Sequence, residues 1–129
     1  MLFKDDRFGL FLHYGIYSVG GWHEQEQWRR GIPKDEYVRY AGRFCPSSQP
    51  DCVDRWLSLA RDAGMTYVCF TTKHHDGFCL WDTAYTDYSV THYTGRDLVR
   101  ELADGCAKYG LKLALYYFAS RLALSGVGQ

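Results

Sequence analysis

The sequence has no surplus charge of either sign, since 15 lysines and arginines balance 15 aspartates and glutamates. Proteins bind nucleic acids and anionic membranes through clustered positive charge, so the composition supports neither partner. We therefore expect no nucleic-acid partner. A neutral ligand is favoured by elimination.

Long apolar runs are also missing. No stretch of about 18 apolar residues occurs, so no membrane-spanning helix is predicted. The N-terminal charges precede a short apolar run without a small-residue cleavage site, so no secretion signal is visible. The compartment stays unknown, and a cytoplasmic location is expected only if Met1 is the true N-terminus.

Paired cysteine motifs are absent, although the chain has five cysteines. Their number is odd and none has the CxxC spacing, which argues against a disulfide framework and against a structural zinc site. We expect mostly reduced, buried thiols. The five residues are Cys45, Cys52, Cys69, Cys79 and Cys106.

The length of 129 residues and the hydrophobic content of 47% favour one domain with its own core. Near the N-terminus, Phe8–His13 (FGLFLH) has the continuous apolar pattern of a strand buried on both faces. After a loop at residues 14–32, Lys34–Gly42 predicts a short helix. Cys45–Pro50 (CPSSQP) then predicts a turn-forming linker.

The rest of the chain predicts two similar units, each an amphipathic helix that ends at a glycine and is followed by a buried strand. The helices are expected at 51–64 and 97–110, and the strands at 65–72 and 111–117. Asp51 is the expected N-cap of the first helix, and Gly64 and Gly110 are the expected ends.

Alternating strands and helices are typical of a parallel sheet with right-handed crossovers, so the predicted fold class is α/β. Two arrangements are open, a doubly wound sheet and a closed barrel. The first usually carries GxGxxG or GxxxxGK[ST] after its first strand, and HYGIYSVGG fits neither motif. The long loops after the first two strands favour the barrel, in which such loops bind substrate.

The segment TTKHHDGFCLWDT places His74 and His75 at the C-terminal end of the second predicted strand, where parallel sheets bind ligands. His13 ends the first strand in the same way, and neighbouring strand ends lie side by side. The sequence therefore predicts three imidazoles on one rim. Neutral imidazoles both donate and accept hydrogen bonds, which suits the vicinal hydroxyls of a sugar.

Two alternatives compete with a sugar site. Metal ligation by His74 and His75 needs a bend between them, because adjacent side chains on a strand point to opposite faces. The stronger metal motifs HExxH and Hx3H are absent. In the plainer alternative, one histidine belongs to a polar core network and the other is exposed.

Apolar walls for such a pocket could come from nearby aromatic residues, of which we expect no more than two to take part because lone tryptophans are more often core. The candidates are Trp22, Trp28, Phe78 and Trp81. Asp76 and Asp82 lie in contexts typical of turns and caps. Glycoside hydrolysis needs two positioned carboxyl groups, and no strong pair is visible.

Three segments together resemble the N-terminal part of the α-L-fucosidases, glycoside hydrolase family 29. They are FGLFLHYGIYSVGGW, TTKHHDGFCLWDTAYTDYS and GRDLVRELADGCAKYGLKLALYY. The resemblance covers residues 8–117. The histidine-rich segment in its strand-then-aromatic context carries most of the specificity.

This resemblance implies that residues 1–129 are part of one catalytic domain, with a divergent tail at 118–129. The implied fold is the N-terminal part of a (β/α)8 TIM-like barrel, with about three parallel strands and the barrel incomplete. The implied reaction is retaining hydrolysis of terminal α-L-fucose from a fucosylated glycan or fucoside. It uses no metal and no other cofactor.

The resemblance also implies which residues contact fucose. A tyrosine at the end of the third strand takes part, and strand alternation favours Tyr116 over Tyr117 because it puts Tyr116 on the inward face. The first loop is expected to contribute two further residues. The implied substrate-binding set is His13, His74, His75, Tyr116, Glu24 and Trp28.

The catalytic nucleophile and the acid/base are implied to lie beyond Gln129, so neither is assigned. Three strands cannot close an eight-stranded barrel, which takes about 250 residues. Open sheet edges would then favour self-association. The alternative function is a non-catalytic fucose-binding or assembly module, completed by self-association or by a second chain.

Overall fold

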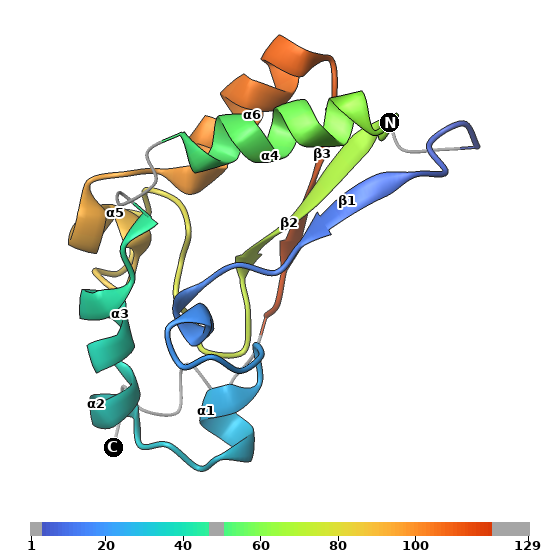
Figure 1. The fold of residues 1–129 in the computed structure, drawn as a ribbon. Helices are drawn as coiled ribbons and strands as arrows, with labels where there is room; N and C mark the ends of the chain where they lie inside the picture. Colours follow the sequence, from blue (N-terminus) through green and yellow to red (C-terminus); the bar gives the residue numbers. More distant parts are fainter. Residues whose placement is uncertain (1–3, 47–50, 120–129) are drawn as a thin grey trace.

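The structure is a computed structural model that describes residues 4–46 and 51–119 (Figure 1). Its centre is a parallel sheet in the order β1-β2-β3, formed by Gly9–Leu12, Tyr67–Lys73 and Lys112–Tyr117. The middle strand pairs in parallel with both neighbours. The predicted α/β class with three parallel strands is therefore confirmed, and the sheet is open.

Helices α4 (Cys52–Asp62) and α6 (Leu98–Tyr109) connect the strands and lie side by side on one face of the sheet (Figure 1). Shorter helices lie in the loops near the C-terminal ends of the strands: η1 (Ile16–Ser18), α1 (Glu26–Arg29), α2 (Lys34–Tyr37), α3 (Arg39–Arg43) and α5 (Val90–Thr94). Within the described ranges, no helix has the length and apolar character needed to cross a membrane.

The helix ends agree with the sequence patterns to within a residue or two. At the start of α6, the Asp97 carboxylate accepts a hydrogen bond from the backbone N–H of Arg100, and Gly110 ends the helix in the left-handed conformation with φ 69°. Asp51 occupies the N-cap position of α4 without a capping hydrogen bond. Gly64, with φ 87°, follows the C-cap of that helix.

The prediction that the first strand is buried on both faces is wrong. β1 lies at the edge of the sheet and pairs only with β2 in the described residues, and Phe8 and Phe11 are 52% and 51% exposed. The apolar pattern alone does not show whether a neighbouring strand is present. On the opposite edge, Leu115 and Tyr117 of β3 are each 56% exposed.

One further local prediction needs correction. The helix expected at Lys34–Gly42 is divided into α2 and α3, which meet at Val38. Of the predicted linker, Ser47–Pro50 lies outside the described residues. The five cysteines are free thiols; Cys45 is exposed, Cys69 is half-buried and the other three are buried.

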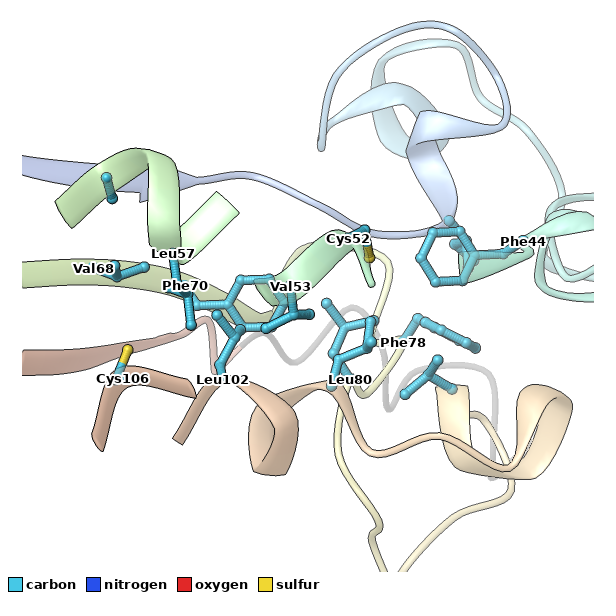
Figure 2. Close-up of a cluster of buried hydrophobic side chains, with 14 of the residues drawn as sticks. Phe44, Cys52, Val53, Leu57, Val68, Phe70, Phe78, Leu80, Leu102 and Cys106 are labelled. Carbon is cyan, nitrogen blue, oxygen red and sulfur yellow. The ribbon is translucent and has the colours of Figure 1, made fainter. Parts of the chain in front are cut away.

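The hydrophobic core fills the space where α4, α6 and β2 meet. Figure 2 shows Val53 and Leu57 of α4, Phe70 of β2 and Leu102 of α6 in one cluster. Leu57 is completely buried. A Cβ atom on Gly105 of α6 would lie 2.4 Å from Leu57 Cδ1, so α6 lies against the Leu57 side chain at a residue that has no side chain of its own.

Leu57→Ala is expected to lower the free energy of unfolding by about 2 to 5 kcal/mol, because it leaves a cavity between the two helices and the sheet. Urea denaturation followed by circular dichroism measures the change. Leu59→Ala is the matched control on the same helix: Leu59 is 70% exposed, so its change should stay within about 0.5 kcal/mol. Equal losses in both variants would contradict the location of the core.

Candidate functional site

Two histidines meet at the C-terminal end of the sheet. His13 directly follows β1 and His74 directly follows β2, and because these strands pair in parallel the residues after them are neighbours. Their ring centroids are 5.5 Å apart. The His75 ring lies 4.9 Å from that of His74, so the three imidazoles form a row.

The third strand adds a tyrosine to this row. The Tyr116 ring stacks on His74 with centroids 5.2 Å apart and an interplanar angle of 26°. Tyr117 lies on the other face of the sheet, with its ring 6.2 Å from Trp81 and the Lys73 ammonium 4.7 Å over it. Strand alternation thus places Tyr116, and not Tyr117, beside the histidines.

Of the two residues predicted from the first loop, the structure brings one to the histidines. A ligating atom of Glu24 and one nitrogen each of His13 and His74 lie within 4.8 Å of one another. Trp28, on α1, is 63% exposed and is not among the rings that contact the three histidines in the described part of the chain. Those rings belong to Phe11, Tyr17, Tyr116 and Phe118.

Phe118 was not predicted from the sequence. Its ring is nearly parallel to His74 at 5.8 Å and lies 4.0 Å from His75. Its backbone N–H donates to the carbonyl of Lys73 at 3.1 Å, which extends the pairing of the third strand by one residue beyond Tyr117. Continuing the alternation from Tyr116 would have found it, since residues two apart share a face.

In the described residues, no aromatic ring predicted for the pocket walls is in ring contact with His13, His74 or His75. Phe78 is 2% exposed and belongs to the core, and Trp81 lies on the helix-covered face beside Tyr117. Trp22 packs on His23 with centroids 4.1 Å apart. The apolar surface next to the histidines therefore comes from Phe11 and Phe118 instead.

The His74 ring has a defined protonation state. The backbone N–H of His75 donates to its Nδ1 at 3.0 Å, so the proton of the neutral ring is on Nε2. Burial, helped by the neighbouring His75, lowers the pKa of His74 to about 4, and Glu24 opposes the change. His74 is therefore uncharged at neutral pH and donates a hydrogen bond through Nε2.

Glu24 complements this donor. Its partial burial favours the protonated form and raises the pKa, but a backbone hydrogen bond and the nearby His74 and His13 outweigh that effect, so the pKa is lowered overall. The carboxylate is ionised at neutral pH and accepts hydrogen bonds. Donor and acceptor atoms therefore face the same small space.

Two histidines and a carboxylate are also a ligand set for zinc or iron, so His13, Glu24 and His74 are the candidate residues for a metal. A metal needs a lone pair on nitrogen. The Nδ1 lone pair of His74 accepts the His75 N–H, and Nε2 carries the hydrogen. The arrangement therefore suits a hydroxyl group better than an ion.

Asp76 has a structural role, as its turn context predicts. Its Oδ1 accepts from the backbone N–H of Phe78 at 3.1 Å, and its Oδ2 accepts from the Tyr37 hydroxyl at 3.2 Å. The residue is 7% exposed, and burial raises its pKa to about 6. Asp76 thus ties the turn after β2 to α2.

Comparisons with known proteins agree on one family. The family model described as Alpha-L-fucosidase matches residues 1–123. The tissue alpha-L-fucosidase of Rattus norvegicus is 33% identical over 131 residues, which cover 89% of this chain and 28% of that protein. The chain thus spans less than a third of the length of that relative.

Solved structures give the same result. The alpha-L-fucosidase isoenzyme 1 from Paenibacillus thiaminolyticus has a TM-score of 0.81 and 44% identity, over 87% of this chain and 26% of that chain. A GH29 alpha-L-fucosidase from Bacteroides thetaiotaomicron, trapped as a covalent intermediate in complex with 2-fluoro-fucosyl fluoride, has a TM-score of 0.79 and 30% identity. It matches over 88% of this chain and 28% of that chain.

Phe118→Ala is expected to raise the pKa of His74 from about 4 toward the usual histidine value, by about one unit, because the ring that helps bury it is removed. An NMR pH titration of the His74 ring protons measures the change. Tyr117→Ala, one residue away on the other face, should leave this pKa where it is. An unchanged pKa in Phe118→Ala would show that Phe118 does not bury His74.

Asp76→Asn is expected to change how stability depends on pH. Asp76 has a pKa of about 6 in the folded state against 3.8 as the ordinary value, so its contribution is complete below pH 3.8 and is lost as pH rises through 6, amounting to about 3 kcal/mol. His74 acts oppositely, because its folded pKa of about 4 is below the ordinary 6.5 and stability is lost as pH falls.

The variant keeps only the second effect, so its free energy of unfolding should fall more steeply than that of the wild type between pH 6 and pH 4. Urea denaturation at several pH values measures this difference. Asp82→Asn, at an exposed position, should follow the wild type. Parallel curves for Asp76→Asn and the wild type would contradict a buried, proton-retaining Asp76.

Proposed function

Since this chain belongs to the α-L-fucosidase family, glycoside hydrolase family 29, we propose that it carries the fucose-binding part of a retaining glycosidase site. The observation that carries the proposal is the convergence of His13, Glu24 and His74 at the C-terminal end of a parallel sheet. In barrels built from such sheets, this end binds the substrate.

The hydrogen-bonding groups of the cluster match a sugar. A sugar hydroxyl donates one hydrogen bond and accepts two, so it needs a donor and an acceptor beside each other. Glu24 only accepts and His74 Nε2 donates, and the Tyr116 hydroxyl does either. Adjacent hydroxyls of one fucose ring could bond to these groups together. We propose that His13 and His75 also contact the bound sugar.

The aromatic rings complete the pocket. One face of a pyranose consists of C–H groups, which pack on apolar rings, and Phe11 and Phe118 offer such surface on the two sides of the histidine row. An anionic ligand would find no opposite charge at the neutral His74 and would be repelled by the Glu24 carboxylate. The part that the family resemblance implies for Trp28 has no support in these contacts, so we leave it out of the proposed pocket.

The chemical step needs groups other than those of the proposed pocket. Retaining glycosidases use two carboxyl groups, a nucleophile and an acid/base. Both oxygens of Asp76 are engaged in structural hydrogen bonds, and Glu24 sits among sugar-binding groups. We assign nucleophile and acid/base to sequence beyond Gln129, and the three strands to the first part of a (β/α)8 barrel. No metal takes part.

A trapped intermediate in a related structure supports retention. The Bacteroides thetaiotaomicron enzyme holds a covalent intermediate formed with a fucosyl fluoride. A covalent glycosyl-enzyme is the intermediate of the retaining mechanism. The natural substrate class that we propose is accordingly a glycan or fucoside with terminal α-L-fucose.

A second candidate function is assembly through the sheet edges. Both edge strands have large exposed apolar residues: Phe11 on β1 with Phe8 just before it, and Leu115 and Tyr117 on β3. Unpaired strand edges with apolar faces promote pairing with another chain. Size-exclusion chromatography with a fucose titration tests this function, and a monomer without saturable binding would exclude it.

The fucose-binding proposal predicts saturable chemical-shift changes at His13 and His74 when L-fucose is titrated into the ¹⁵N-labelled chain. His74→Phe and His13→Ala should each weaken binding about tenfold, since each removes a hydrogen-bonding partner. His92→Ala is the control, because His92 lies on α5 and its ring contacts Tyr93. Equal affinity in all three variants would refute the assigned site.

The missing-carboxylate proposal predicts that the same chain does not release aryl alcohol from an aryl α-L-fucoside above the rate of a buffer blank. A sugar-binding site without the nucleophile and the acid/base lacks the two groups that carry retaining hydrolysis. Hydrolysis at a rate like that of a full-length enzyme would show that the catalytic carboxyl groups are already present.

A further inference from the structure

One buried hydroxyl joins the ends of the first two strands. Thr71, on β2, is 1% exposed. Its Oγ1 donates to the Leu12 carbonyl at 3.2 Å and accepts from the Tyr14 backbone N–H at 3.4 Å. The Tyr17 hydroxyl lies 3.4 Å from the same oxygen.

These contacts use every hydrogen-bonding capacity of the Thr71 hydroxyl. A hydroxyl has one hydrogen to donate and two lone pairs to accept with. Because the hydrogen goes to Leu12, the two lone pairs accept from Tyr14 and Tyr17. Burial raises the pKa of Tyr17, so its hydroxyl keeps the proton that it donates. The Thr71 hydroxyl therefore has no hydrogen-bonding capacity left for a ligand.

The residue between the two backbone contacts is His13. The pairing of β1 with β2 ends at Leu12 opposite Phe70, so the sheet ladder does not include His13. Thr71 bonds to the residue on each side of it. The Tyr17 ring, held by the same hydroxyl, packs edge-on against His74 with centroids 6.4 Å apart. Thr71 therefore contacts the backbone on both sides of His13 and, through Tyr17, the surroundings of the His74 ring.

The next residue, Thr72, makes a similar contact with β3 on the other side of β2. The Thr72 hydroxyl donates to the Tyr116 carbonyl at 2.8 Å, where the pairing of β2 with β3 changes register between Thr71 and Lys73. Consecutive threonines at the end of β2 thus hold the backbone of both flanking strands beside His74.

We propose that Thr71 is a positioning residue that sets the separation of His13 and His74 before the sugar binds. It touches no ligand itself. Its hydroxyl fixes the backbone around His13 where the ladder has ended, and through Tyr17 it limits where the His74 ring lies. The sugar-binding readout of this inference rests on the proposed function, whereas the geometry of the two rings does not.

The test uses two substitutions at one position in the full chain. Thr71→Val keeps the shape of the side chain and removes the hydroxyl, and Thr71→Ser keeps the hydroxyl. We expect Thr71→Val to lose the nuclear Overhauser effect between the His13 and His74 ring protons and to bind L-fucose about tenfold more weakly. Thr71→Ser should retain both properties, which a need for bulk alone would not explain.

Thr66→Val is the matched control, because Thr66 is an exposed threonine just before the same strand. It should leave the ring contact and the affinity unchanged. Tyr17→Phe removes one of the three hydrogen bonds and should weaken the ring contact and the affinity in the same direction, by about threefold. If Thr71→Val does not fold, Tyr17→Phe tests whether the Thr71 hydrogen bonds position the two rings.

The outcomes separate the two proposals. If the wild type shows the ring contact but does not bind L-fucose, the proposed function fails, and the ring contact in the variants still tests Thr71. If Thr71→Val keeps both the ring contact and the affinity of the wild type, Thr71 is not a positioning residue. If Thr71→Val does not fold, an unchanged Tyr17→Phe overturns the inference.

Discussion

The site depends on the parallel pairing of β1 with β2. Because Leu12 lies opposite Phe70, the chain leaves both strands at the same edge of the sheet, and His13 and His74 follow within a few residues. Shifting the register by one residue would turn every side chain of a strand to the other face and separate the two rings. Leu10 and Leu12 of β1 pack against the core that contains the completely buried Phe70 of β2, and this packing favours the observed register. Stability and site geometry therefore have a common origin in one strand pair.

The environment of the histidine row is as important as its position. Phe118 and Tyr116 stack on His74 and exclude water from it, which keeps the imidazole neutral and leaves Nε2 as a donor. The adjacent Glu24 stays ionised and accepts. A buried donor beside a partly buried acceptor is suited to a ligand that offers both, and it discriminates against one that lacks hydroxyl groups because the polar atoms would then stay unpaired.

The sequence predicted the parts of the fold that depend on periodicity. Apolar spacing identified the three strands and both long helices, and alternation along the third strand distinguished Tyr116 from Tyr117. It failed where the outcome depends on packing between distant segments. The exposure of Phe8 and Phe11 depends on what lies beside β1, which no local pattern encodes. Local pattern also does not tell where the side chains of the first loop point: Glu24 reaches the histidines and Trp28 is exposed, and a role for Trp28 in binding stays a prediction. Phe118 could have been found by extending the alternation one step.

Binding of fucose between His13 and His74 is the claim on which the proposed function rests. Intermolecular nuclear Overhauser effects between L-fucose ring protons and the ring protons of the intact chain test it most directly. We predict contacts from the same bound sugar to both histidine rings and to Phe118. Saturable binding with contacts only to the other face of the sheet, where Trp81 and Tyr117 lie, would contradict it.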